Sequence, residues 1–234
     1  MRINKKEYFY KNLTRAKIIF FALFLLSSKS FAQVEPIETI TYDISPLGYS
    51  EYQDFGPVEF SGGMANFVIF KTQAMGFKDI EKIYSDPKNH LPLKVEREVS
   101  MWLHDEQLIE DYNAGENKLT ITKFEGGRKT KEYLFTADAP IDNAILLPFS
   151  LRKVPNLGIG WSYDIRLPDK FKVEIVALEY VTVPAGTFKA YHFMSTPYKF
   201  EIWITDDELR LPVKIKGVGG FSYTLSMMKH ILKK

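Results

Sequence analysis

Residues 200–217 read Phe-Glu-Ile-Trp-Ile-Thr-Asp-Asp-Glu-Leu-Arg-Leu-Pro-Val-Lys-Ile-Lys-Gly, and this stretch decides the fold. Apolar side chains occupy alternate positions on both sides of an acidic segment, Asp206-Asp207-Glu208. Alternation with period two is the pattern of a half-buried strand, and a short polar segment between two such runs is typical of a hairpin turn. The stretch therefore predicts two antiparallel strands joined by a solvated acidic tip, whose carboxylates need no catalytic role.

A second copy of this pattern lies 120 residues earlier, at residues 84–95, which read Tyr-Ser-Asp-Pro-Lys-Asn-His-Leu-Pro-Leu-Lys-Val. The matched positions are Asp86 with Asp206, Leu91-Pro92 with Leu211-Pro212, and Lys94 with Lys214. One copy in dissimilar surroundings does not make a solenoid, because solenoids stack several repeats. We interpret the echo as one hairpin design used twice in a curved sheet, with proline entering the strand where its missing N–H costs least.

Strand signals recur along the rest of the chain, as segments rich in β-branched and aromatic residues between glycine, proline and asparagine turns. The further strands that we expect are residues 38–44, 64–73, 78–84, 91–103, 107–112, 118–124, 129–135, 161–167, 171–183, 188–195 and 221–228. Between the first two, Pro46, Gly48 and Pro57 indicate a loop region.

The strand rhythm breaks at residues 139–154. There Asp142 is the candidate N-cap of a short helix that runs to Leu147 and is limited by Pro148. Without helical crossovers the strands should connect in antiparallel fashion. We therefore predict an all-β fold with one short helix, in which residues 33–234 form a single curved antiparallel sheet of about a dozen strands, as an open or closed barrel.

Residues 1–32 have the pattern of a cleavable signal peptide. Basic residues precede an apolar run at residues 18–26, and Ser30-Phe31-Ala32 places small residues three and one positions before a cut ahead of Gln33. A membrane span needs about 20 apolar residues, whereas this run has nine. We expect cleavage after Ala32, a periplasmic product, and no integral membrane span after cleavage. The chain has no cysteine, which excludes a lipid-modified cysteine anchor and a disulfide framework.

The leader also determines the charge balance. The whole chain has 31 basic and 29 acidic residues, but seven of the basic residues and one acidic residue lie in the leader. The remaining part has 24 basic and 28 acidic residues, and its net charge is −4 rather than +2. No basic block suits a phosphate backbone, so nucleic acid is excluded as a leading partner.

The sequence offers no arrangement that names a reaction. The four histidines are His90, His104, His192 and His230, and none has the spacing of a helical zinc motif. There is no Gly-x-Ser-x-Gly elbow and no cysteine nucleophile. The glycines at 217–220 join strand to strand, whereas a nucleotide loop leads into a helix. We expect no catalytic residues, no metal and no cofactor, although a hydrolase with a convergent site around His192 or His104 is one hypothesis.

The candidate ligand contacts are Arg97, Trp161, Phe193 and Trp203. Arg97 falls on the apolar face of the strand at residues 91–103, where it either pairs with an acid, reaches the rim with its stem packed, or binds a ligand anion. Aromatic residues such as the other three usually build the core. The alternative is that the curved sheet encloses an apolar cavity for a lipid or another small ligand.

The segment Val183-Pro184-Ala185-Gly186-Thr187-Phe188, followed by Ile202-Trp203 and then Leu211-Pro212-Val213-Lys214, resembles the exported bacterial family known as domain of unknown function 3108. The likeness extends from Thr39 to Leu225. It implies an exported, curved, barrel-like antiparallel domain, with no established catalytic residues to carry over. More distantly, the strand, acidic turn and Leu-Pro strand are similar to periplasmic lipoprotein carriers, whose half-barrels hold acyl chains under longer helices.

These observations favour a non-enzymatic protein of the cell envelope that binds an apolar or amphiphilic molecule, a lipid or a glycan, in or along the curved sheet. The alternative is an assembly factor for envelope polysaccharide or outer-membrane proteins that acts through an envelope protein partner.

Overall fold

A computed structural model describes residues 35–45, 47–102, 104–217 and 223–233. The description below concerns the compact unit Pro36–Lys234. The expected signal peptide and its cleavage after Ala32 lie outside the described residues. No helix in the described ranges is long and apolar enough to cross a membrane.

The described residues form fourteen strands and one short helix. The strands are β1 (Glu38–Ser45), β2 (Gly48–Phe60), β3 (Gly63–Ala74), β4 (Phe77–Ser85), β5 (Pro92–Met101), β6 (His104–Asn113), β7 (Lys118–Glu125), β8 (Arg128–Thr136), β9 (Ser162–Leu167), β10 (Asp169–Val183), β11 (Gly186–Thr196), β12 (Phe200–Thr205), β13 (Pro212–Gly217) and β14 (Thr224–Leu232). The helix is α2 (Leu147–Leu151).

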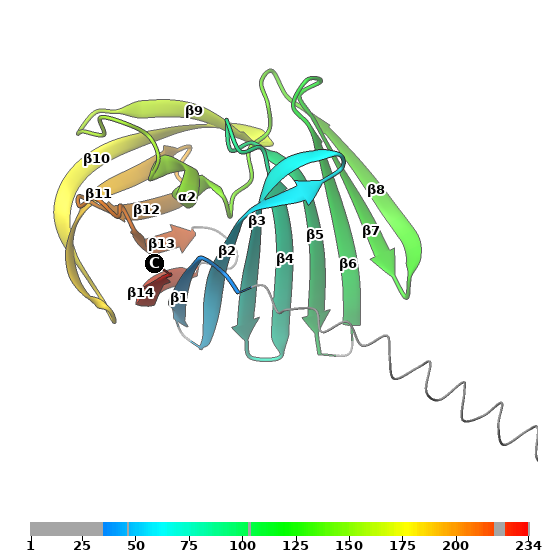
Figure 1. The fold of residues 1–234 in the computed structure, drawn as a ribbon, viewed down its shortest axis with the longest axis horizontal. Coiled ribbons are helices and arrows are strands. Elements are labelled where there is room, and N and C mark those ends of the chain that lie inside the picture. The colour runs from blue at the N-terminus through cyan, green and yellow to red at the C-terminus, as the bar shows by residue number, and fades with distance from the viewer. Residues whose placement is uncertain (1–34, 46, 103, 218–222, 234) are drawn as a thin grey trace, which may run out of the picture. The chain divides into compact units, whose positions relative to one another are not determined.

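All fourteen strands belong to one curved antiparallel sheet (Figure 1). Their spatial order is β8-β7-β6-β5-β4-β3-β2-β1-β14-β13-β12-β11-β10-β9, so the first and last strands of the domain, β1 and β14, pair in the middle. Hydrogen bonds do not join the outer strands β8 and β9 within the described ranges, and the sheet is open. The predicted fold class is confirmed, in its open form.

The hairpin at residues 200–217 is confirmed as β12 and β13, which pair from Phe200 with Gly217 to Ile204 with Pro212. The expected loop between the first two strands is wrong, because β2 runs through Gly48 and Pro57 without a break. Gly48 is the first residue of β2, and Pro57 directly follows a β-bulge that shifts the register between Asp54 and Gly56, a place where strands accommodate proline. Pro46 lies outside the described residues.

The helix starts later than expected. It spans Leu147–Leu151, so Pro148 stands in its first turn and does not end it. Proline is favoured there because the first helical N–H groups have no partner within the helix. Asn143 and not Asp142 organises the approach, since its side-chain oxygen accepts from the N–H groups of Ile145 and Leu146 at 2.9 and 3.1 Å.

Helix α2 lies on the inner side of the curved sheet (Figure 1) and joins two apolar cores. Leu146 and Phe149 pack in a cluster with residues of β1–β5 and β10–β14, whereas Leu147 and Leu151 pack in a cluster with residues of β9–β12. Because one short segment contributes to both clusters, the position of α2 is fixed from two directions, and polar groups at its end are held against the sheet.

Candidate functional site

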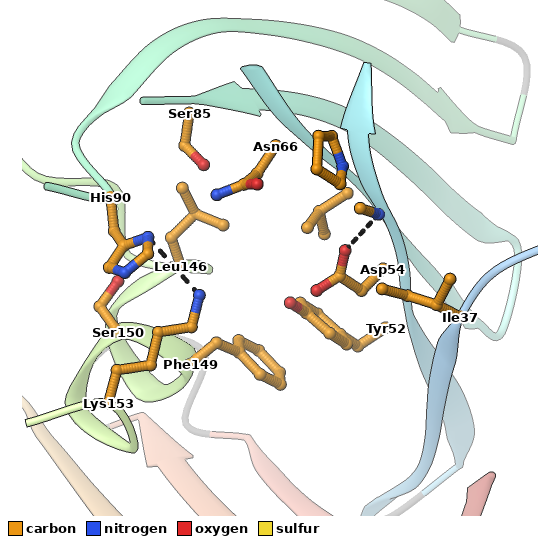
Figure 2. Close-up of a pocket in the computed structure, with 13 residues that line it drawn as sticks. Ile37, Tyr52, Asp54, Asn66, Ser85, His90, Leu146, Phe149, Ser150 and Lys153 are labelled. Atoms are coloured by element: carbon orange, nitrogen blue, oxygen red, sulfur yellow. Dashed lines mark hydrogen bonds between the residues drawn. The ribbon is translucent and has the colours of Figure 1, made fainter. Parts of the chain in front are cut away.

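A pocket of about 170 Å³ lies between α2 and strands β2–β4 (Figure 2). Its base is aromatic, because the rings of Tyr52 and Phe149 stack with centroids 3.5 Å apart and planes 10° apart. Both rings are almost fully buried. The residues that line it are Ile37, Tyr52, Asp54, Gly56, Pro57, Asn66, Val68, Ser85, His90, Leu146, Phe149, Ser150 and Lys153.

The bulge in β2 places the acid of the pocket. Asp54 pairs with Val68 and Gly56 with Phe67, so Phe55 is the extra residue. Gly56 has φ of +73°, a conformation that glycine adopts without steric cost. Its N–H donates to Asp54 Oδ1 at 2.7 Å, and the carboxylate points into the pocket (Figure 2).

The basic wall is built by the turn between β4 and β5 and by the end of α2. His90 Nδ1 lies 3.5 Å from Lys153 Nζ. In the equivalent turn between β12 and β13, Arg210 donates to the Val154 carbonyl. His90 and Arg210 occupy matched positions before the two Leu-Pro pairs, and both have positive φ, 60° and 46°. The two echoed turns therefore contact the same segment at the end of α2.

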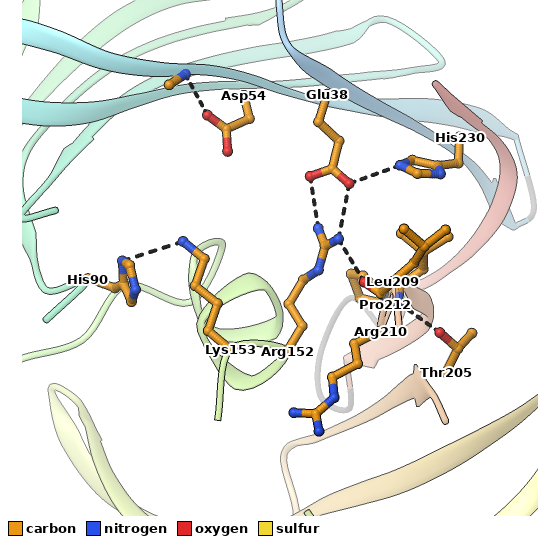
Figure 3. A network of polar contacts seen from close by, with 12 residues as sticks. Glu38, Asp54, His90, Arg152, Lys153, Thr205, Leu209, Arg210, Pro212 and His230 are labelled. Carbon is orange, nitrogen blue, oxygen red and sulfur yellow. Dashed lines mark hydrogen bonds and ion pairs between the residues drawn. The ribbon is translucent and has the colours of Figure 1, made fainter. Parts of the chain in front are cut away.

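A buried ion pair ties that segment to the middle of the sheet (Figure 3). Glu38, at the start of β1, accepts from Arg152 Nη1 at 2.9 Å and from Nη2 at 3.1 Å. His230 Nε2 of β14 lies 2.9 Å from the same carboxylate, and Arg152 also donates to the Leu209 carbonyl at 2.9 Å. The bidentate geometry fixes the guanidinium, and it leaves the next residue, Lys153, facing the pocket.

Burial sets the electrostatics of the pocket. It lowers the pKa of the Lys153 ammonium, and nearby Arg152 lowers it further, while Asp54 opposes both effects. Burial and the charge of Lys153 lower the pKa of the His90 imidazole. Burial also raises the pKa of the Asp54 carboxyl, against a hydrogen bond from the backbone. In each case the environment disfavours the charged form, so a ligand of opposite charge would gain affinity from neutralising it.

The four predicted contact residues do not line this pocket. Arg97 points to acids, with its Nε 3.0 Å from Asp79 Oδ1 and 3.7 Å from Glu81 Oε1. Burial alone would lower the pKa of Arg97, but the hydrogen bond to Asp79 and the charge of Glu81 raise it. The interpretation that Arg97 pairs with an acid is therefore confirmed, and a role in ligand binding stays a prediction.

The three aromatic candidates lie in the other half of the sheet, but Trp161 and Phe193 belong to one apolar cluster and Trp203 to the other. Phe193 has no exposed surface, and Trp161 meets it edge-on with ring centroids 6.0 Å apart. Trp203 stacks on His192 with centroids 4.2 Å apart and donates to Glu179 Oε1 at 2.8 Å. The Lys214 ammonium lies 4.8 Å from its ring centroid. Protein groups thus satisfy the indole N–H and pack against the ring of Trp203.

One group of possible metal ligands comes together on β6 and β7 in the described ranges. His104, Glu106 and Glu125 bring one ligand atom each to within 4.8 Å of one another. Lys123 already contacts both carboxylates, with its Nζ 3.1 Å from Glu125 Oε1. The ammonium of Lys123 therefore compensates part of the negative charge of these two half-buried carboxylates.

Sequence reasoning considered His90 only as one of four histidines without metal-ligand spacing, and it missed Asp54 and Lys153 as site residues. A signal for Asp54 existed, because an isolated glycine such as Gly56 inside an alternating run indicates a bulge. Lys153 had no such signal, because its neighbours become apparent only when the two echoed turns meet at the end of α2.

A family model described as "Protein of unknown function (DUF3108)" matches residues 57–226. The chain belongs to this family. The match includes α2, both echoed turns and Lys153, whereas Asp54 and Glu38 lie before it. The family resemblance seen in the sequence is thereby confirmed. Searches of curated proteins and of solved structures gave no match, and the likeness to lipoprotein carriers stays a prediction.

Proposed function

We propose that this family member is a non-enzymatic, exported protein of the cell envelope, and that its pocket receives the polar end of an amphiphilic envelope molecule, a lipid or a glycan. The pattern of residues 1–32 supports export to the periplasm. The pocket supports ligand binding, because an aromatic base lies beneath groups that can donate and accept hydrogen bonds.

The observation that carries the proposal is the state of Lys153. It is an exposed residue that lines the pocket with its Nζ 3.5 Å from His90 Nδ1, and no carboxylate in the described ranges lies within 4.0 Å of that Nζ. An ammonium group without a carboxylate partner has N–H donors that can form charge-assisted hydrogen bonds to an anionic group of a ligand. A ligand with an anionic group beside Lys153 would supply the missing partner.

The size of the pocket limits what it receives. At a share of about 30 Å³ for each water molecule, a volume of about 170 Å³ corresponds to five or six waters. Pockets that enclose a whole drug-sized ligand usually measure about 300–1,000 Å³. The pocket therefore suits a headgroup or one sugar ring, and the rest of the molecule would lie along the sheet.

Native mass spectrometry of the protein recovered from its own envelope tests the proposal. Ser150 lines the pocket from α2, and Ser150→Phe should fill it. We expect a small-molecule adduct on the wild-type protein and on the control Ser162→Phe, whose serine is exposed on β9, but not on Ser150→Phe. An adduct retained by Ser150→Phe would place the ligand elsewhere, and the absence of an adduct on the wild-type protein recovered from its envelope would oppose ligand binding.

An assembly role through a protein partner is the second candidate, supported by an apolar rim. The rim consists of Leu47, Met75, Met101 and Trp102, at the β1–β2, β3–β4 and β5–β6 turns. These side chains are 61, 73, 49 and 85% exposed, and contiguous exposed apolar surface often marks an interaction site. Crosslinking in cells should then give a reproducible protein partner that Trp102→Ser loses. A wild-type pattern without such a partner would oppose this candidate.

A further inference from the structure

We infer that the occupant of this pocket is zwitterionic, with an anionic group beside Lys153 and His90 and an ammonium group beside Asp54. This inference rests on the proposed function and specifies the ligand class. The inference rests on two opposed walls of the pocket. In the described ranges, each wall presents a charged group that has no oppositely charged partner.

The first wall offers donors. An ammonium group has three N–H donors, and Lys153 directs one of them to His90 Nδ1 at 3.5 Å. That contact requires the imidazole to accept at Nδ1, so the neutral ring carries its proton on Nε2. The neighbouring guanidinium of Arg152 is already held by Glu38. Lys153 is thus the cation at this wall whose N–H donors are not all used, and a ligand anion can accept hydrogen bonds from them.

The second wall offers acceptors. Asp54 uses Oδ1 for the Gly56 N–H, and within the described ranges no basic group lies within 4.0 Å of its carboxylate. Register places Asp54 directly opposite Glu38 on the neighbouring strand. Of these two adjacent acids, Glu38 binds Arg152, whereas Asp54 does not pair with Lys153. The second acid and the second base therefore face each other across the pocket without meeting (Figure 3).

This geometry favours a zwitterion over an ion of either sign. A simple anion beside Lys153 would be repelled by Asp54, and a simple cation beside Asp54 would be repelled by Lys153. A molecule with both charges compensates both walls at once. Asn66 and Ser85 add neutral hydrogen-bonding groups to the lining.

Calorimetry on the protein purified from its envelope tests the inference, with phosphoethanolamine, inorganic phosphate and ethanolamine as probes. A hydrogen bond to a charged group contributes about 1.5–3 kcal/mol, so phosphoethanolamine should bind at least about tenfold more tightly than either single-charge probe. Lys153→Gln and Asp54→Asn should each abolish that preference. The control Lys199→Gln, at an exposed lysine of the β11–β12 turn, should retain it.

Equal affinity for phosphate and phosphoethanolamine would overturn the inference, as would an Asp54→Asn variant that binds the zwitterion more tightly. Because the three probes are compared on the wild-type protein, this result does not depend on the folding of a variant. If no probe binds but the adduct persists on wild-type protein and is lost in Ser150→Phe, the inference fails while the proposed function stands. If no probe binds and no adduct is found on the wild-type protein, the inference and the proposed function are both rejected.

The source of the zwitterion is a separate outcome. A short-chain ethanolamine phospholipid that binds more tightly than free phosphoethanolamine would support the inference with a lipid as the source. Equal affinity of the two would support it with a small free molecule as the source.

Discussion

Glu81 lies on β4 with its carboxylate 3.7 Å from Arg97 Nε. Burial raises the pKa of Glu81 to about 7, against the favourable charge of Arg97 and with a further increase from Asp79. The pKa of this carboxyl is therefore higher in the folded state than in the unfolded state, where it is near 4.5. Such a group contributes fully to stability when the pH is below the unfolded-state pKa, and the contribution is lost as the pH rises through the folded-state pKa.

We therefore predict that stability falls between pH 5 and pH 8, by at most about 3 kcal/mol at 1.36 kcal/mol for each pKa unit. Urea unfolding at a series of pH values measures this slope. Glu81→Gln should flatten it, whereas the control Glu98→Gln, at an exposed position of β5, should not. A wild-type protein that gains stability over this range would contradict the assignment.

Glu201 predicts the opposite response at low pH. Burial alone would raise the pKa of Glu201, but hydrogen bonds with Lys216, Tyr198 and His192 lower it to about 2. Its stabilising contribution is complete above the unfolded value of about 4.5 and is lost as the pH falls towards 2. Comparing unfolding at pH 5 and pH 3, we expect Glu201→Gln to lose less stability than the wild type. An identical loss in both proteins would show that Glu201 does not contribute to acid unfolding.

At the scale of elements, α2 is the part whose loss should open the pocket. Phe149 stacks on Tyr52 and belongs to the larger apolar core. Truncation of a buried phenylalanine to alanine typically costs about 3–5 kcal/mol, so Phe149→Ala should lower the free energy of unfolding by that order. Phe135→Ala on β8, where the ring is 37% exposed, should cost clearly less. Equal losses at the two positions would mean that α2 does not pack as described.

The ion pair between Arg152 and Glu38 gives α2 a second attachment. Removing one partner of a buried pair leaves an uncompensated charge and costs about 3–5 kcal/mol. We expect Arg152→Met and Glu38→Gln each to be destabilising, and the double variant to cost less than the sum of the two. Thermal unfolding of the four proteins gives the coupling. Strict additivity would show that the bidentate contact contributes little.

The sequence predicted the elements whose signals are local. The alternation at residues 200–217 and its echo identified two hairpins. The strands expected at residues 118–124 and 129–135, and those at 171–183 and 188–195, form two more. It failed where the structure uses an exception to a local rule. Pro148 was expected to limit a helix but stands in its first turn, and Gly48 and Pro57 suggested a loop although both belong to β2, with a bulge directly before Pro57.

The pocket could be predicted only in part, for a related reason. His90 belongs to a recognisable turn, but its contact with Lys153 joins residues 63 positions apart. The pair of acids Glu38 and Asp54 depends on the register between β1 and β2, and a shift of one residue would send one of them to the other face. The sequence alone does not specify that register.

At the scale of the whole molecule, the open sheet predicts uneven protection. Strand β8 lies at one edge and every residue in it is exposed, whereas β1 is paired on both sides and contains the fully buried Ile40 and Tyr42. Hydrogen exchange followed by mass spectrometry should show fast exchange in β8 and the strongest protection in β1 and β14. Equal protection of β8 and β1 would mean that another molecule covers this edge.

The central claim is that the space between α2 and the sheet receives the polar end of an envelope molecule. The most direct test is a photoreactive residue in place of Ser150, activated in living cells, with mass analysis of the product. Our account predicts a small amphiphile attached at position 150 and none when the same residue replaces exposed Ser162. A protein attached at position 150, or the same small molecule attached at both positions, would contradict it.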